Sequence, residues 1–374
     1  MDTSFCSELV CTPLIDKHKE LGAKLAPFGG WLMPIQYNSI IEEHNWTRMS
    51  AGLFDICHMG EFAVEADLEK SNLDNLVTVN LKVMPLGACR YGFMLNEQAG
   101  IIDDLLVYRI SQSKWMIVVN AATTNGDEAH MRKYMNSATR LENISASTGK
   151  LDLQGPRARD VLNDLIGGDI HLRYYTFGYF DLLGEKIIIS RTGYTGEMGY
   201  ELYMPNNKIA QLWEKLLADK RVKPIGLGAR DTLRLEMGYS LYGQDIDKNT
   251  TPLEAGLGHF IDFDKEFIGK PSLVKQKQDG LSRRMIYFTA LSRRSPRHNY
   301  HLFYKDEDIG SVTSGSFSPS LGVGIGMGYV GRELIPGEEI ILKETGISIP
   351  AKVVNKPIYK NGSAKCEVKN AYTR

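Results

Sequence analysis

The sequence is poor in cysteine and has no cysteine spacing that would support a disulfide framework or a zinc site. Five cysteines are scattered over 374 residues, at positions 6, 11, 57, 89 and 366, and none forms a CxxC pair. An odd, sparse set of this kind is typical of free thiols in a reducing compartment. We therefore expect no structural disulfides and no metal.

Long apolar runs and an N-terminal targeting pattern are also missing. No run approaches the ~20 apolar residues that a membrane-spanning helix needs. The opening residues MDTSFCSELVC contain neither a basic region nor a hydrophobic core, so we expect neither a signal peptide nor a transit peptide. These features predict a cytoplasmic protein without membrane association.

An excess of charge of either sign is absent. The chain has 44 Lys and Arg against 45 Asp and Glu, for a formal net charge of −1. A nucleic-acid binder held by bulk electrostatics needs a basic surface, so no nucleic acid is expected as a partner. The basic residues form only short clusters, such as Arg293-Arg294 and Arg297. Such clusters suit a local anionic ligand better than a polymer.

The length of 374 residues suggests two or three domains. Upstream of about Arg283, strand and helix patterns alternate without regular βαβ order, which indicates an α+β fold with antiparallel sheets. From about Arg283 onward, short β runs alternate with Gly, Ser and Pro, which predicts a small all-β barrel or sandwich.

The segment from Tyr91 to Tyr108, YGFMLNEQAGIIDDLLVY, predicts a β-hairpin with a polar turn at residues 96–100. Its second strand contains adjacent carboxylates, Asp103 and Asp104, whose side chains must point to opposite faces. Asp104 then shares a face with Tyr108. A carboxylate among apolar residues is costly to bury unless it is paired, hydrogen-bonded or protonated. A lone Asp could equally cap a strand or pair with a lysine, but two adjacent ones suggest that one has a function.

Three further signals have ordinary structural explanations. His58 alone is better explained as a buried, hydrogen-bonded histidine. Residues 191–201 contain three glycines but lack GKS or GKT and lie between strands, so no phosphate site is expected there. Arg230 falls in the first turn of a predicted helix, where the dipole is unfavourable for a cation. We therefore expect its side chain to reach toward an acid.

Aromatic residues, acids and one arginine recur in loops and at strand ends, a pattern that suits a flat, polar heteroaromatic ligand. Several short segments together form a specific signature: LGAK at 21–24, GW at 30–31, MP at 33–34, Asp55 with HMG at 58–60, GIIDD at 100–104, SRTGYTGE at 190–197, GLGARD at 226–231, YGQD at 242–245 and TSG at 313–315. On these segments the chain, from Thr12 to about Tyr359, closely resembles the aminomethyltransferases of the glycine cleavage system, the T-protein family.

The resemblance implies an α+β fold with three domains around a central folate-binding cavity and a C-terminal all-β barrel. The expected divisions are a discontinuous first domain that binds folate, a second domain carrying the hairpin, a connecting segment and the barrel. These divisions correspond to residues 12–55 with 145–245, 56–144, 246–282 and 283–374.

The resemblance also implies a reaction. The aminomethyl carbon carried by S-aminomethyl-dihydrolipoyl H-protein would pass to tetrahydrofolate, with release of ammonia, giving 5,10-methylenetetrahydrofolate and dihydrolipoyl H-protein. The implied partners are lipoylated H-protein and tetrahydrofolate as acceptor substrate. Two alternatives stay open: a tetrahydrofolate-dependent demethylase on the same fold, and a non-catalytic folate-binding module. The latter proteins carry a KGCYxGQE segment, whereas residues 239–245 here are YSLYGQD, without the cysteine.

By position, Asp104 matches the family acid that faces the folate nitrogens, and it is the expected catalytic residue. A fixed carboxylate in a dry cavity would stabilise positive charge that develops as ammonia leaves. The residues that match folate contacts are Met59, Tyr91, Asp104, Tyr108, Asn120, Tyr175, Tyr194, Glu201 and Arg230. Arg297 matches an arginine at the cavity mouth.

Open points remain for individual residues. Tyr108 could hydrogen-bond Asp104 or stack on the ligand, and Asp103 is expected to be structural. Arg230 could contact the ligand or a structural acid such as Glu201. The chain departs from the family pattern at Cys57, where serine is usual, and at Ala99, where glycine is usual. The tail also lacks the expected arginine pair, for which Lys365 is the nearest substitute.

Overall fold

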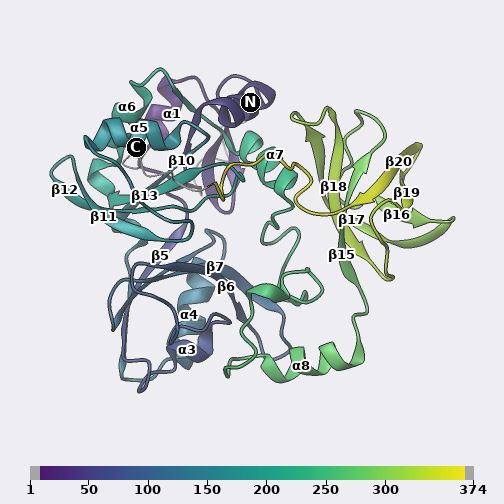
Figure 1. Cartoon of the computed structure of the whole chain (residues 1–374), viewed down its shortest axis with the longest axis horizontal. Coiled ribbons are helices and arrows are strands. Elements are labelled where there is room, and N and C mark those ends of the chain that lie inside the picture. The colour runs from purple at the N-terminus through teal and green to yellow at the C-terminus, as the bar shows by residue number, and fades with distance from the viewer. Residues whose placement is uncertain (1–8, 367–374) are drawn as a thin grey trace, which may run out of the picture.

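The computed structural model describes residues 9–366. Two α+β units lie one above the other on one side of Figure 1, and a β-barrel lies on the other side. A small sheet at the start of the chain joins the first unit. It consists of β1 (Val10–Cys11), β3 (Trp31–Gln36) and β2 (Lys24–Phe28), in that order. Within the described residues no helix is long and apolar enough to cross a membrane.

The first unit is built on a six-stranded sheet. In sheet order its strands are β11 (Phe177–Leu182), β12 (Glu185–Ser190), β13 (Gly199–Pro205), β10 (Thr148–Gln154), β4 (Ala51–Asp55) and β14 (Val222–Pro224). The pair β14·β4 is parallel, and the other pairs are antiparallel. The order brings residues before 56 and after 145 into one sheet, which agrees with a discontinuous first unit.

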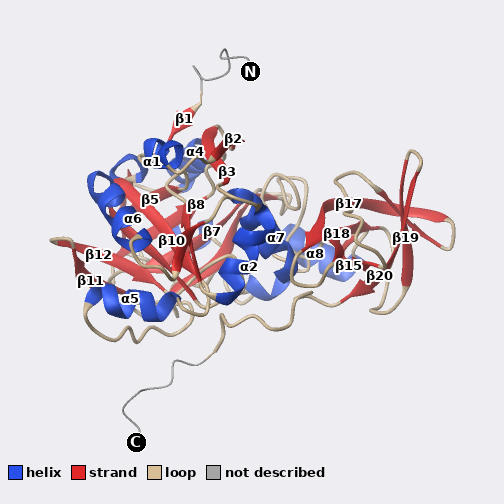
Figure 2. Ribbon diagram, turned by 90° about the horizontal axis from the view of Figure 1, so that it is seen from above, coloured by secondary structure: helices blue, strands red, loops and turns tan. Residues whose placement is uncertain are grey.

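Helices cover both faces of this sheet because successive strand residues point to opposite sides. On one face, Leu53 belongs to a core that also takes up Leu14, just before α1 (Ile15–Glu20), and the apolar sides of α5 (Ala158–Ile166) and α6 (Ile209–Leu217). On the other face, Phe54 packs with Ala229 and Leu233 of α7 (Leu227–Met237), beside α2 (Ile40–Met49). Figure 2 shows α2 and α7 between the sheet and the barrel. Helix α2 begins after Ser39, whose side chain accepts a hydrogen bond from the backbone N–H of Glu42, as in a Ser-x-x-Glu capping pattern.

The second unit is an antiparallel five-stranded sheet. Its order is β6 (Cys89–Leu95), β7 (Ile101–Arg109), β8 (Lys114–Val119), β5 (Gly60–Ala66) and β9 (Thr139–Asn143), with helices α3 (Leu73–Leu76) and α4 (Thr124–Tyr134). Strands β6 and β7 form the predicted hairpin, in which Phe93 lies opposite Asp104. In its turn, Ala99 has φ 65°, a conformation that favours glycine. Ala99 therefore adopts the left-handed backbone conformation that glycine would adopt more easily at this position.

The C-terminal unit is a closed six-stranded barrel, which confirms the predicted all-β barrel. Around the barrel the strands are β15 (Arg284–Ala290), β18 (Val323–Val330), β17 (Glu307–Ser318), β16 (His301–Tyr304), β19 (Glu339–Glu344) and β20 (Ile347–Val354). The segment that leads into the barrel contains α8 (Lys270–Asp279). Its apolar residues Leu257, Phe267 and Leu273 share a core with the hairpin residues Phe93 and Ile101.

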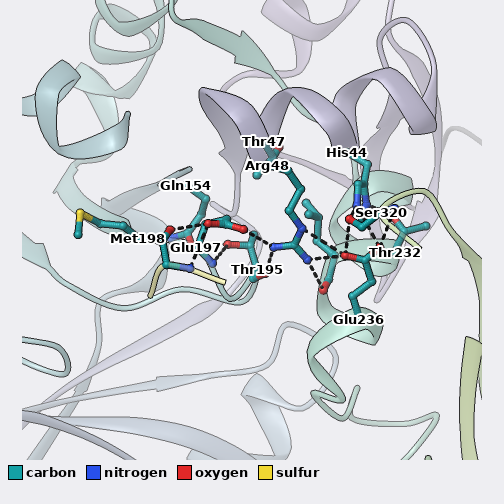
Figure 3. Close-up of polar contacts among 12 residues, drawn as sticks. His44, Thr47, Arg48, Gln154, Thr195, Glu197, Met198, Thr232, Glu236 and Ser320 are labelled. Carbon is teal, nitrogen blue, oxygen red and sulfur yellow. Dashed lines mark hydrogen bonds and ion pairs between the residues drawn. The ribbon is translucent and has the colours of Figure 1, made fainter. Parts of the chain in front are cut away.

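A buried polar network around Arg48 joins the first unit to the barrel (Figure 3). The Arg48 guanidinium pairs with Glu197 at 2.8 Å and with Glu236 at 2.7 Å. Glu236 also accepts a hydrogen bond at 2.9 Å from Ser320, in the turn between β17 and β18. His44 contacts the same Ser320 hydroxyl at 2.9 Å. Removing Arg48 would leave two buried carboxylates without their cation, so this network fixes the barrel against α2 and α7.

Candidate functional site

The hairpin presents the Asp104 carboxylate with a separate hydrogen-bond donor on each oxygen. Tyr91, from the facing strand β6, donates its hydroxyl to Oδ2 at 2.9 Å. Asn120, just after β8, donates its side-chain amide to Oδ1 at 2.7 Å. Both donors are neutral. Each carboxylate oxygen therefore keeps a further lone pair available for another partner.

Asp104 lies in a place that is enclosed by protein and still reachable from solvent. Its side chain is only partly buried, yet burial is the main cause that raises the pKa of this carboxyl above its ordinary value, against the lowering effects of Tyr91 and Asn120. Seven of the nine predicted folate contacts are partly buried in the same way, and only Tyr108 and Glu201 are fully buried.

Glu201 on β13 belongs to a second polar cluster, in the sheet of the first unit. It pairs with the buried ammonium of Lys150 at 3.0 Å and accepts a hydrogen bond from Tyr203 at 2.9 Å. Burial acts to raise the pKa of Glu201, but Lys150 outweighs it and the pKa is lowered. Glu201 is therefore an ionised acceptor held in one position. Lys150 also contacts the sulfur of Met59 at 3.5 Å.

Arg230 on α7 reaches an acid, as expected, but the acid is Asp152 rather than Glu201. The guanidinium lies 2.6 Å from the Asp152 carboxylate, which is fully buried on β10. Of the two alternatives for Arg230, the pairing with Glu201 is not formed, because Lys150 already pairs with that carboxylate, and contact with the ligand remains a prediction. Asp152 and Glu201 face each other across β10 and β13, so Arg230 still lies close enough for its charge to lower the pKa of Glu201.

Tyr194 connects these clusters. Its ring lies 5.0 Å from the Arg230 guanidinium, and the charge of Asp104 acts to raise the pKa of its hydroxyl. Tyr194 and Tyr175 both contribute to the raised pKa of Tyr91. The backbone of Tyr175 has φ 61°, an uncommon conformation for a bulky residue. The hairpin acid and the first-unit cluster therefore lie around one aromatic group.

Tyr108 does not contact Asp104. Although the two residues share a strand, the Tyr108 hydroxyl is fully buried and hydrogen-bonds Tyr203 at 2.8 Å and Ser190 at 3.1 Å. The residue that bonds Asp104 is Tyr91, which lies on the neighbouring strand. The expectation that Tyr108 hydrogen-bonds Asp104 is therefore wrong, and as a folate contact it remains a prediction.

The expectation for His58 is half right. The side chain is buried, with 7% of its surface exposed, but its Nδ1 has no hydrogen-bond partner. It packs edge-on against Phe28 instead. Burial lowers the pKa of His58 to about 4, so the imidazole is neutral at pH 7.

Arg297 stays apart from these clusters. It is exposed in the connection between β15 and β16, and within residues 9–366 no ion pair involves it.

Cys57, the departure from serine, is buried and donates its thiol to the backbone oxygen of Lys150 at 3.3 Å. Among the described residues, no three His, Cys, Asp or Glu side chains are grouped to hold a metal ion.

Sequence reasoning missed Lys150, Asp152, Tyr203 and Glu61 as members of the site. A signal was present, because residues 150–154, KLDLQ, alternate polar and apolar side chains. Alternation of period two sends Lys150, Asp152 and Gln154 to one face of β10. All three side chains are buried, so this face lies against protein rather than solvent.

Comparison with known proteins agrees with the fold. Residues 14–265 match the family model described as GCVT N-terminal domain, and residues 283–360 match the glycine cleavage T-protein C-terminal barrel domain. The chain is 47% identical over 352 residues to the aminomethyltransferase of Halothermothrix orenii, covering 92% of this chain and 99% of that protein. It is 43% identical over 360 residues to the aminomethyltransferase of Listeria monocytogenes serotype 4a, covering 95% and 99%.

A solved structure is similar over the same extent. The crystal structure of glycine cleavage system aminomethyltransferase T from Bartonella henselae has a TM-score of 0.88 and 36% sequence identity, and the match covers 94% of this chain and 98% of that one. Together, these matches define the protein as a group transferase. The chain belongs to the aminomethyltransferase family of the glycine cleavage system, the T-proteins. The demethylase and the non-catalytic module are not favoured.

Proposed function

We propose that this aminomethyltransferase moves the aminomethyl carbon from S-aminomethyl-dihydrolipoyl H-protein to tetrahydrofolate. Ammonia leaves, and the products are 5,10-methylenetetrahydrofolate and dihydrolipoyl H-protein. The observation that carries the proposal is the Asp104 carboxylate, held by Tyr91 and Asn120 through neutral hydrogen bonds, with the Glu201–Lys150 and Arg230–Asp152 pairs on the neighbouring sheet.

The residues present suit tetrahydrofolate as a substrate. Asp104 and Glu201 offer fixed acceptors for N–H groups, and Tyr194 and Tyr175 offer flat faces for a ring system. Arg230 supplies a cation for a carboxylate. Its charge is already neutralised in part by Asp152, so it serves orientation more than affinity. The remaining predicted contacts are Met59, Tyr91, Tyr108 and Asn120.

Asp104 is the proposed catalytic residue. Positive charge develops near the transferred carbon as ammonia leaves, and a preorganised carboxylate stabilises such charge without reorganising. Tyr91 and Asn120 keep the carboxylate oriented through neutral hydrogen bonds, so its negative charge is not cancelled by a cation.

The test is tetrahydrofolate-dependent ammonia release from aminomethylated H-protein. We expect Asp104→Asn to lower kcat by ~100-fold, or about 3 kcal/mol of transition-state stabilisation. Affinity for tetrahydrofolate, measured by titration, and the melting temperature should change little. Full kcat in a folded Asp104→Asn protein would contradict the assignment. Activity of the wild type only on a small N-methylated amine would favour the demethylase.

For the partner, we propose that Arg293, Arg294 and Arg297 contribute to docking of the acidic lipoyl carrier. All three are exposed in the β15–β16 connection, and none forms an ion pair within the described residues. Charges of this kind affect association rate and specificity more than affinity, and salt screens them.

We expect KM for H-protein to rise with salt, and the rise to be smaller in a variant with all three arginines changed to glutamine. A matched control is Arg332→Gln, an exposed arginine on the same barrel that already pairs with Glu307. The same KM at low and high salt would rule out electrostatic docking.

A cytoplasmic location also remains a prediction.

A further inference from the structure

Asp103 is fully buried on the opposite face of β7 from Asp104, yet it is connected to the site. Its Oδ2 accepts the backbone N–H of Asn120 at 2.9 Å, and its Oδ1 accepts the Asn120 side-chain amide at 2.8 Å. One carboxylate therefore holds both the main chain and the side chain of Asn120.

Asn120 carries this connection around the end of β8 to the catalytic acid. Its side-chain nitrogen has two hydrogens. It lies 2.8 Å from Oδ1 of Asp103 and 2.7 Å from Oδ1 of Asp104. With both hydrogens directed at carboxylates, the amide cannot rotate without losing one of the two bonds. The orientation of the Asp104 carboxylate therefore depends on Asp103.

A third acid, Asp127 on α4, completes the cluster. It is fully buried, and neither of its oxygens has a hydrogen-bond partner among the described residues. Burial is the main cause that raises the pKa of Asp127 to about 7. Burial likewise raises the pKa of Asp103, and the charge of Asp127 adds to that effect. Within residues 9–366 no Lys or Arg forms an ion pair with Asp103, Asp104 or Asp127.

We propose that Asp103 is a positioning residue for the aminomethyl transfer: it orients Asp104 through Asn120. This inference rests on the proposed function. It explains why two adjacent acids are needed. Asp104, on one face of β7, is the proposed catalytic residue, while Asp103, on the other face, holds Asn120 in place.

The first test compares kcat and KM in Asp103→Asn. An amide offers one acceptor oxygen where the carboxylate offers two, so one Asn120 bond is lost. We expect kcat to fall about tenfold, which corresponds to ~1.4 kcal/mol. KM for tetrahydrofolate and KM for H-protein should each stay within about twofold of the wild-type value. This pattern is expected for an interaction that matters in the transition state. The control is Asp74→Asn, which removes another buried acid of the same unit, one that caps Leu81 and pairs with Lys265. It should lower the melting temperature and leave kcat unchanged.

The second test is a double-mutant cycle with Asn120→Ala. If Asp103 acts through Asn120, adding Asp103→Asn to Asn120→Ala should lower kcat no further. Losses that multiply would show that Asp103 acts by another route and would overturn the proposal.

Failure of this inference is distinct from failure of the proposed function. An inactive wild type on aminomethylated H-protein would refute the function. An active wild type, with Asp104→Asn inactive and Asp103→Asn fully active, would leave the function intact and refute the positioning role.

Discussion

At the scale of single residues, Glu201 and Arg230 each pair with a more deeply buried group of opposite charge. Glu201 is held by Lys150, which is 1% exposed, and Arg230 is held by Asp152, which is 0% exposed. An unpaired charge at such depth would cost several kcal/mol, so the deeper partner makes it possible to keep each of these two ions in the site. The ligand then meets charges that are already oriented, which lowers the entropy cost of binding.

Glu61, next to this cluster, is the residue whose titration should be visible in stability. It is 1% exposed, and its Oε1 has no hydrogen-bond partner. Burial raises the pKa of Glu61 to about 8, with Glu201 adding to the effect and Lys150 opposing it. Between its unfolded pKa of about 4.3 and the folded value, the folded state binds more protons than the unfolded state. Glu61 therefore makes the protein less stable as pH rises through this window.

We expect Glu61→Gln to gain stability relative to the wild type as pH rises from 5 to 8. The measurement is the free energy of unfolding in urea at both pH values. Glu65→Gln, exposed on the same strand, is the control and should show no such trend. A difference between Glu61→Gln and wild type that stays the same at pH 5 and pH 8 would mean that Glu61 does not hold its proton in the folded state.

At the scale of elements, the hairpin that carries Asp104 is fixed at its turn by the segment after α7. The backbone N–H of Ile101 donates to the oxygens of Asp247 and Thr250, and Asn96 donates its side chain to the oxygen of Lys248. Gly100 lies directly beneath this contact. A Cβ built on Gly100 would lie 1.8 Å from the Lys248 backbone oxygen.

We expect Gly100→Ala to lower the free energy of unfolding by roughly 1–3 kcal/mol, the usual cost of overpacking. It should also lower kcat, because the backbone that must move leads directly into β7. The matched control is Gly126→Ala in α4, where an added Cβ meets nothing within 4 Å. It should stabilise the protein by up to ~1 kcal/mol through helix propensity. If Gly100→Ala is as stable as the wild type, the contact between Gly100 and the Lys248 backbone can move without a cost in free energy.

At the scale of the whole molecule, the Arg48 network holds parts of the chain that are far apart in sequence. Beyond Glu197 and Glu236, it includes Ser318 of the barrel and Ser363 after it, both of which donate to these acids. The first unit, the barrel and the segment after it are thereby tied near one buried guanidinium, which is 6% exposed. Burial opposes ionisation of Glu236, but His44 and Arg48 outweigh it and lower its pKa to about 2.

We expect Arg48→Met to lower the free energy of unfolding by about 3–5 kcal/mol, because two buried carboxylates lose their cation. Denaturant unfolding followed by tryptophan fluorescence gives the measurement. Arg132→Met is the control, since it breaks an exposed pair with Glu128 and should cost no more than ~0.5 kcal/mol. Equal effects of the two substitutions would argue that the network is not important for stability.

The sequence by itself determined those features that depend on local order. The alternation in residues 101–108 determined the two faces of β7, Ser39 with Glu42 determined where α2 begins, and the short β runs after Arg283 determined the barrel. The motifs also identified the family. Each of these signals lies within a few residues of chain, where periodicity and capping act.

Tertiary structure alone decided which charged groups meet. Arg230 and Asp152 are 78 residues apart in the sequence. Glu201 on β13 meets Lys150 on the neighbouring strand β10. Asp103 and Asp104 point to opposite faces, as their alternation requires, yet Asn120 at the end of β8 connects them. Such contacts depend on which strands become neighbours in the sheet. A local pattern cannot specify this, because the energy of pairing arises only after distant segments have packed together.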